Sequence, residues 1–89
     1  MSKRLKENSK NRANHFSTFD LGCAAALISI GFKLISLNKQ NPNKVLFIFE
    51  KKVDIEEVVN KYFSGKLKVS ARVLIDNIKM LKNMIYSNF

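Results

Sequence analysis

The side chains that could do chemistry in this sequence are mostly cations, and one group of them follows helical spacing. Arg72 and Lys79 lie seven residues apart and Lys82 follows three residues later, so a helix would place them along one side. A row of ammonium and guanidinium groups can follow the phosphates of a nucleic-acid backbone. For any single residue, an ordinary solvated helix face is an equally good interpretation. The cations predicted to bind within the folded part are Lys51, Lys52, Lys66, Lys68, Arg72, Lys79 and Lys82.

A second set of cations lies in the first fifteen residues. Only one acid, Glu7, accompanies them, and Leu5 is the only large aliphatic residue after the start. Because so little apolar surface cannot bury a core, we predict that residues 1–15 form a disordered basic arm. Such an arm either attracts a polyanion or is a solvated leader without a role. Its cations are Lys3, Arg4, Lys6, Lys10 and Arg12.

The charge of the whole chain points in the same direction. Its 89 residues contain 16 Lys and Arg against 7 Asp and Glu, which gives a net charge of +9 and an isoelectric point near 10.0. An excess of this size in one small domain favours polyanions, usually nucleic acid and sometimes an acidic membrane surface. A proteome that loads every surface with lysine is the alternative explanation.

Residues with catalytic or metal-binding potential are few and isolated. His15 is the only histidine and Cys23 the only cysteine, so neither a zinc site nor a Cys–His pair has a second member. We interpret Cys23 as a small core residue. Asp54, Glu56 and Glu57 cluster, but they stand at a predicted helix start, where the helix dipole favours acids. We therefore expect no catalytic residues, no metal, no cofactor and no enzymatic activity.

Segments that would direct the chain to a membrane are also missing from the pattern. Residues 1–15 lack the apolar stretch of a secretory signal, and the apolar run Leu21–Ile30 is far shorter than a membrane span. A lone cysteine is compatible with a reducing compartment. We expect a soluble, cytoplasmic protein without a membrane partner.

The strand around which the remaining elements are expected to assemble is Val45–Phe49. All five residues are apolar, so the side chains on both faces require cover, with Leu46 and Ile48 opposite the two phenylalanines. A strand over Phe32–Leu37 and a loop over residues 38–43 precede it. This arrangement predicts an antiparallel hairpin.

Three helices are predicted, each from a start signal. The first follows a capping box of Ser17 and Asp20, with Phe16 and Leu21 as a hydrophobic staple, and ends before Gly31. The second follows Asp54 and Glu57, with Val53 and Val58 as the staple. It presents Ile55, Val58, Val59 and Tyr62 on one face and ends at Ser64 and Gly65. The third follows Ser70 and is expected to bury Ala71, Leu74, Ile75, Ile78, Leu81 and Ile85, with a second stripe of Val73, Met80 and Met84.

These elements predict a single α+β domain over residues 16–89, in the order helix, antiparallel hairpin, helix, helix (α-β-β-α-α). Each predicted helix has its own start signal and each boundary its own loop signal, so the local patterns agree with one another. The residues expected in the core are Leu27, Ile28, Phe47, Phe49, Val58, Leu74 and Ile78.

Several of these landmarks also carry a resemblance. They are Thr18, Asp20 and Leu21 at a helix start, Gly31 after it, Phe47 and Phe49 in the strand, Tyr62, Gly65, Leu67 and Val69 between the last two helices, and Leu81 and Tyr86 in the last helix. Over about residues 16–86 the chain resembles a small uncharacterised domain family of phages, bacteria and archaea. The resemblance implies an α+β fold and a phage or mobile-element setting. Its motifs are structural, so it implies no active site.

Two function classes remain. We expect a small non-enzymatic protein that binds nucleic acid through phosphate contacts with little sequence preference, because no group of residues resembles a base-reading motif. DNA and RNA, and single and double strands, stay open as partners. The alternative is a protein-interaction or assembly module with no nucleic-acid role, a homodimer or a subunit of a larger complex, since a two-stranded hairpin is barely stable by itself. The two classes are compatible in a homodimer or a larger nucleoprotein complex that binds nucleic acid.

Overall fold

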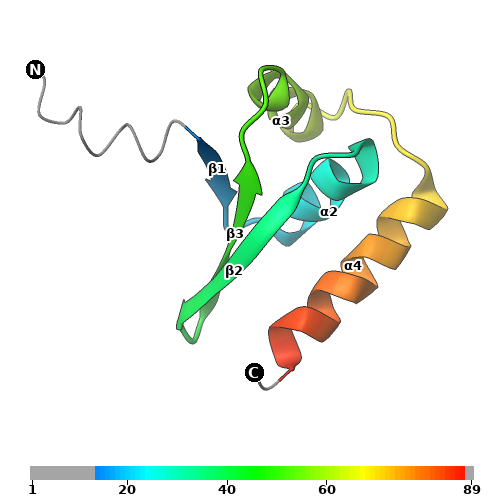
Figure 1. The fold of residues 1–89 in the computed structure, drawn as a ribbon. Helices are drawn as coiled ribbons and strands as arrows, with labels where there is room; N and C mark the ends of the chain where they lie inside the picture. Colours follow the sequence, from blue (N-terminus) through cyan, green and yellow to red (C-terminus); the bar gives the residue numbers. More distant parts are fainter. Residues whose placement is uncertain (1–13, 88–89) are drawn as a thin grey trace, which may run out of the picture.

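The computed structural model describes residues 14–87, which fold as an α+β domain in the order strand, helix, hairpin, helix, helix (Figure 1). The elements are β1 (His15–Thr18), α2 (Leu21–Ile30), β2 (Leu34–Asn41), β3 (Lys44–Glu50), α3 (Ile55–Phe63) and α4 (Ala71–Tyr86). The three strands form one antiparallel sheet in the order β1-β3-β2. The predicted α+β class is confirmed, and the apolar strand β3 is central.

The strand β1 was not predicted, and it changes how α2 begins. Phe16 pairs with Phe49 across the sheet, and Ser17 lies within β1. The predicted capping box and staple are therefore wrong. Asp20 is the cap, and its Oδ1 accepts a hydrogen bond of 2.7 Å from the backbone N–H of Cys23. His15, which the prediction counted with the basic arm, begins β1; residues 1–13 of that arm lie outside the described residues.

The hairpin is longer and tighter than predicted. β2 continues to Asn41, and only Pro42 and Asn43 separate it from β3, so the predicted loop over residues 38–43 is wrong. Asn38 lies opposite Leu46 and Asn41 opposite Lys44. Pairing with the strongly apolar β3 extends a polar segment whose own sequence favours a loop. An irregularity between Leu34 and Ser36 shifts the register near the start of β2.

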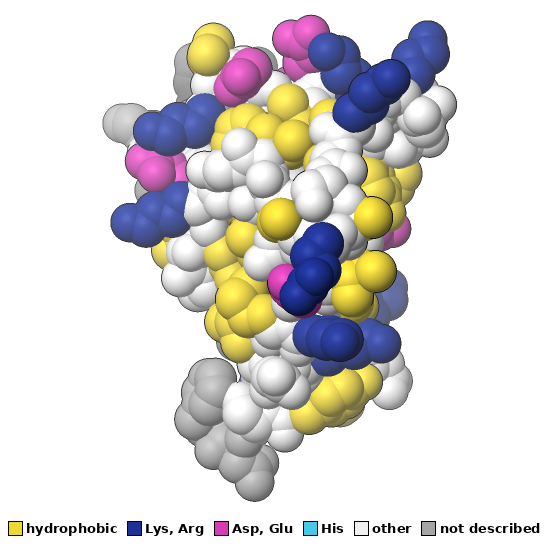
Figure 2. Space-filling model, turned by 90° about the vertical axis from the view of Figure 1, so that its right-hand side faces the viewer, with side chains coloured by type: hydrophobic (Ala, Val, Ile, Leu, Met, Phe, Trp, Pro, Cys, Tyr) yellow, Lys and Arg dark blue, Asp and Glu magenta, His cyan; other side chains and the backbone are white. Residues whose placement is uncertain are grey.

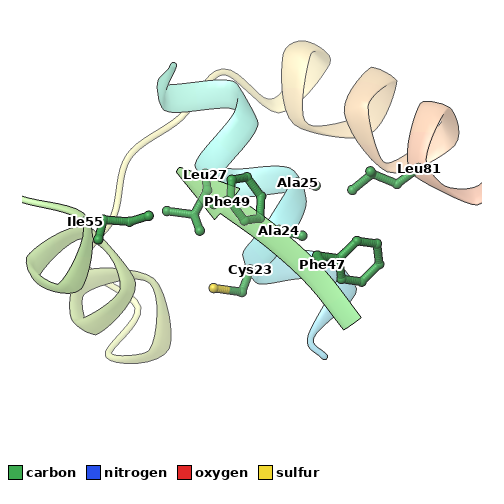
Figure 3. Packing of buried hydrophobic residues seen from close by; sticks show 8 residues of the cluster. All are labelled: Cys23, Ala24, Ala25, Leu27, Phe47, Phe49, Ile55 and Leu81. Carbon is green, nitrogen blue, oxygen red and sulfur yellow. The ribbon is translucent and has the colours of Figure 1, made fainter. Parts of the chain in front are cut away.

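The core lies between one face of the sheet and the three helices. Phe47 and Phe49 of β3 are buried against α2, whose small residues from Cys23 to Ala26 let the helix approach the sheet closely. Ile55 of α3 and Leu81 of α4 are fully buried in the same cluster, one from each side (Figure 3). Every residue predicted for the core either belongs to this cluster or packs against it.

The faces of α3 and α4 follow the sequence pattern only in part. Ile75, predicted to be buried, is 50% exposed, because helical geometry turns it about 120° away from the buried Leu81. Ala71 is exposed as well, whereas Met84 packs against the core. Val53 is fully exposed, so the predicted staple of α3 is wrong, and Asp54 at its cap position makes no side-chain cap bond.

The other boundaries of the last two helices agree with the prediction. Ser70 caps α4 by accepting a hydrogen bond of 3.3 Å from the N–H of Val73. Gly65 adopts a φ of 77° directly after Ser64, the left-handed conformation in which glycine ends helices without strain. Within residues 14–87, no helix combines the length and the apolar character needed to cross a membrane.

The second face of the sheet has no layer of described residues upon it. Ile35, which lies at the register shift of β2, is 46% exposed. Leu46 and Ile48 are partly buried and stay outside the core cluster, because they point away from the helices that cover Phe47 and Phe49. The sequence correctly indicated two apolar faces, and within the described chain only one of them is covered.

Candidate nucleic-acid interface

Acidic side chains gather around α3, where they pair with lysines. The Nζ of Lys51 lies 3.4 Å from a carboxylate oxygen of Glu56, and the Nζ of Lys52 lies 3.6 Å from one of Glu50. Lys61 pairs in the same way with an acid one helical turn earlier, at 3.7 Å. All these side chains are well exposed, so the pairs add little stability. Lys51 and Lys52, both predicted binding residues, nevertheless present partly neutralised charge.

The predicted cation row on α4 is interrupted by an acid. The Nε of Arg72 lies 3.8 Å from a carboxylate oxygen of Asp76, which falls between Arg72 and Lys79 on the helix surface. Lys79 and Lys82 form no ion pair with any residue of the described chain. The row therefore starts effectively at Lys79, and Arg72 contributes less to it than its spacing indicated.

Four predicted cations are exposed and make no ion pair within residues 14–87. Lys66 and Lys68 lie in the segment that leads from α3 into α4, and Lys79 and Lys82 lie on α4 itself. We call these four residues the unpaired lysines. The face that carries α4 shows Lys and Arg side chains separated by hydrophobic ones, so the positive charge there is spread out (Figure 2).

An open pocket of about 340 Å³, lined by both apolar and polar residues, lies beside the hairpin turn between the start of α2 and the end of α4. Its exposed rings are Phe19, at 57% exposure, and Tyr86, at 78%. Phe47 and Ile85 provide apolar walls. The Nζ of Lys44 lies 5.3 Å from the centroid of the Phe19 ring, within the range of a cation–π contact. We call this feature the aromatic cavity.

Sequence reasoning missed the aromatic cavity because its members come from distant segments. One signal was readable: Lys79, Lys82 and Tyr86 follow i, i+3, i+7 spacing, which places the ring on the same stripe of α4 as the two lysines. No comparable pattern links Phe19 to Lys44, since the first follows β1 and the second begins β3.

The end of α4 is fixed to the sheet by a lysine. The Nζ of Lys39, which points from β2 towards the helices, donates hydrogen bonds to the carbonyl oxygens of Met84 (2.8 Å) and Ser87 (3.2 Å). These carbonyls lie at the negative end of the helix dipole, where a cation is favourable. The contact holds the helix end that carries Tyr86. The prediction had placed Lys39 in a loop, so this role was missed.

Cys23 is fully buried, as predicted for a small core residue. Burial first, and the nearby charge of Asp20 second, raise the pKa of its thiol to about 11, so the thiol stays protonated at neutral pH. The same two causes raise the pKa of Tyr62, whose hydroxyl lies where a Cβ at Gly22 would be. Residues 14–87 contain no group of three or more His, Cys, Asp or Glu side chains that could hold a metal ion.

Comparison with known protein families identifies the family to which this domain belongs. Residues 13–87 match the family described as Domain of unknown function (DUF5659). The chain belongs to this family. The match includes all six elements, so the unpaired lysines and the aromatic cavity lie inside the family domain. The cations from Lys3 to Arg12 precede it. No curated protein and no solved structure matches the chain.

Proposed function

We propose that this domain binds nucleic acid without catalysing a reaction, through phosphate contacts that tolerate many sequences. The observation that supports the proposal is the division of the cations of residues 14–87 into ion-paired and unpaired ones. Three of the six acids of residues 14–87 pair with Lys51, Lys52 and Lys61 around α3, whereas the unpaired lysines follow the chain into α4 and along it. Cations that form no ion pair need not leave an acid before they replace counterions on a phosphate backbone.

The paired cations and the arm have secondary parts in this proposal. Residues 14–87 contain eleven Lys and Arg against six Asp and Glu, a net charge of +5, so the folded part attracts polyanions on its own. Lys51, Lys52 and Arg72 must leave an acid to contact a phosphate. The five cations of residues 1–13 add non-specific attraction. We place the protein in the cytoplasm, where nucleic acid is accessible.

The salt dependence of binding tests the proposal, because each neutralised phosphate on duplex DNA contributes about 0.9 to the slope of log affinity against log salt. In one variant the unpaired lysines are replaced together by Gln (Lys66→Gln, Lys68→Gln, Lys79→Gln, Lys82→Gln). In the matched control the four paired cations are replaced (Lys51→Gln, Lys52→Gln, Lys61→Gln, Arg72→Gln). Both variants lose four positive charges.

We expect the first variant to lose up to about 3.6 units of slope on duplex DNA and the control to lose clearly less. The loss should be nearly the same for unrelated sequences, because phosphates carry no base information. Equal losses in the two variants would show that only net charge matters. Failure of the unmodified protein to retard DNA or RNA at low salt would reject nucleic-acid binding altogether.

A protein-interaction module is the second candidate, and the uncovered face of the sheet favours it. Ile35, Leu46 and Ile48 lie on that face, and the outer edges of β1 and β2 pair with no strand of the described chain. Free edges and an apolar face are common sites of self-association. Light scattering at micromolar concentration should then give twice the monomer mass of 10.2 kDa. A monomer mass would reject a homodimer.

A further inference from the structure

The aromatic cavity combines features that the proposed phosphate contacts do not use. Two large rings, Phe19 and Tyr86, are mostly exposed on its rim, although aromatic side chains of this size normally bury most of their surface. We propose that these rings stack against unpaired bases, so that the domain prefers single-stranded nucleic acid. This inference rests on the proposed function and deepens it, because it assigns the strandedness of the partner and a site for its bases.

The chemistry of the cavity suits a base better than a purely apolar ligand. A base has a flat π-face for stacking and polar edges that remain partly solvated, and sequence-tolerant proteins hold single strands on exposed rings of this kind. Phe47 and Ile85 supply apolar walls behind the rim. The Nζ of Lys44 lies over one face of the Phe19 ring, so a base stacks on the opposite face, and the ammonium group adds attraction for the phosphates of the strand.

The position of Tyr86 connects the cavity to the unpaired lysines. Lys82 and Tyr86 are four residues apart on one stripe of α4, which corresponds to about 6 Å along the helix axis. Stacked nucleotides of one strand rise by about 3.4 Å each along the strand axis, so this separation corresponds to about two nucleotides. A strand whose phosphates contact Lys79 and Lys82 therefore brings its next bases to the cavity.

Base pairing decides which nucleic acid can use the site. In a duplex each base already stacks between its neighbours, and the groove presents only base edges, so the rings of Phe19 and Tyr86 could not reach a base face. An unpaired strand exposes these faces. Preference for single strands follows from the geometry of stacking and requires no hydrogen bonds that identify particular bases.

The test compares two oligonucleotides of equal length and charge, a twelve-nucleotide strand of dT and the same backbone with abasic sites. For the unmodified protein, anisotropy titration should show about tenfold tighter binding to the dT strand. Phe19→Leu and Tyr86→Leu each keep an apolar side chain and remove a ring, so each should lower this ratio several-fold while the salt slope is retained. Phe63→Leu is the control, since Phe63 of α3 is 61% exposed and does not line the cavity.

A second readout follows the ring itself. The chain has two tyrosines and no tryptophan, so in a Tyr62→Phe variant Tyr86 is the only strong intrinsic fluorophore. Its emission should be quenched when the dT strand binds, and the abasic strand should leave it nearly unchanged. Unchanged emission at saturation with dT would overturn the inference.

The outcomes separate the two proposals. Equal affinity for dT and abasic strands, with a steep salt slope, overturns base stacking and leaves phosphate binding intact. An equal fall of the ratio in Phe63→Leu and in the cavity variants also overturns it, because the effect would then not belong to the cavity. Failure of either strand and of duplex DNA to bind at low salt overturns both proposals.

Discussion

Replacement of Phe47 tests the packing on which the whole domain depends. Phe47 is 1% exposed, lies on the central strand, and packs in the cluster formed by α2, β3, α3 and α4. Removing a buried phenylalanine ring forfeits its transfer free energy and leaves a cavity, which together cost about 3 to 5 kcal/mol. A domain of this length has a total unfolding free energy of roughly 4 to 11 kcal/mol. We therefore expect Phe47→Ala to lose about 3 to 5 kcal/mol, a large share of that total, and to unfold at a much lower urea concentration than the unmodified protein.

The assay is urea unfolding followed by circular dichroism, with two companion variants. Phe47→Leu keeps most of the apolar volume, so it should fold and lose about 1 to 2 kcal/mol. Phe63→Ala removes a ring that is 61% exposed and should lose less than about 1 kcal/mol. A Phe47→Ala protein that unfolds at nearly the same urea concentration as the unmodified protein would refute the assignment of Phe47 to the core.

Two further predictions concern Lys39 and Cys23. Lys39→Gln removes the hydrogen bonds to the Met84 and Ser87 carbonyls. It should cost about 1 kcal/mol and accelerate hydrogen exchange selectively in the last turn of α4, whereas unchanged exchange there would contradict the capping role. The Cys23 thiol should react with a thiol reagent at pH 8 only after unfolding. Because folding raises its pKa from 9.0 to about 11, the unfolded chain releases the proton first, so the unfolding free energy should fall as pH rises across that interval. A Cys23→Ala variant provides the control and should lose less stability over the same pH range.

The elements predicted most accurately are those whose signal is local. α3 has the predicted extent and α2 the predicted end, because Gly65 and Gly31 follow these helices. The strand β1 was not predicted because its four residues are ordered by pairing with β3, about thirty positions later in the chain. Pairing with β3 also extends β2 past Asn38, into a segment whose own residues favour a loop. For β1 and for the end of β2, pairing within the sheet therefore outweighs the local preference of the segment.

The candidate interface was likewise predictable only in part. Residue type alone identified Lys66, Lys68, Lys79 and Lys82, but the sequence could not show that the acids around α3 pair with other lysines. For Arg72 the sequence does show an acid one helical turn away, Asp76, but the prediction considered only the spacing of the cations and overlooked this ion pair. Charge neutralisation depends on which side chains meet in space, so a count of cations overstates the surface that is free to bind.

The proposed phosphate contacts and the proposed base contacts involve different parts of the fold, so each can be tested by its own substitutions. The unpaired lysines occupy solvent-exposed positions along the segment leading into α4 and on α4 itself, where substitution leaves the core untouched. The aromatic cavity instead shares Phe47 with the core, and its α4 wall is held in place through Lys39. Loosening that wall should therefore weaken base stacking before it weakens phosphate binding. In the proposed function, a domain with this arrangement attracts a strand through charge and orders it where the sheet and the end of α4 are joined.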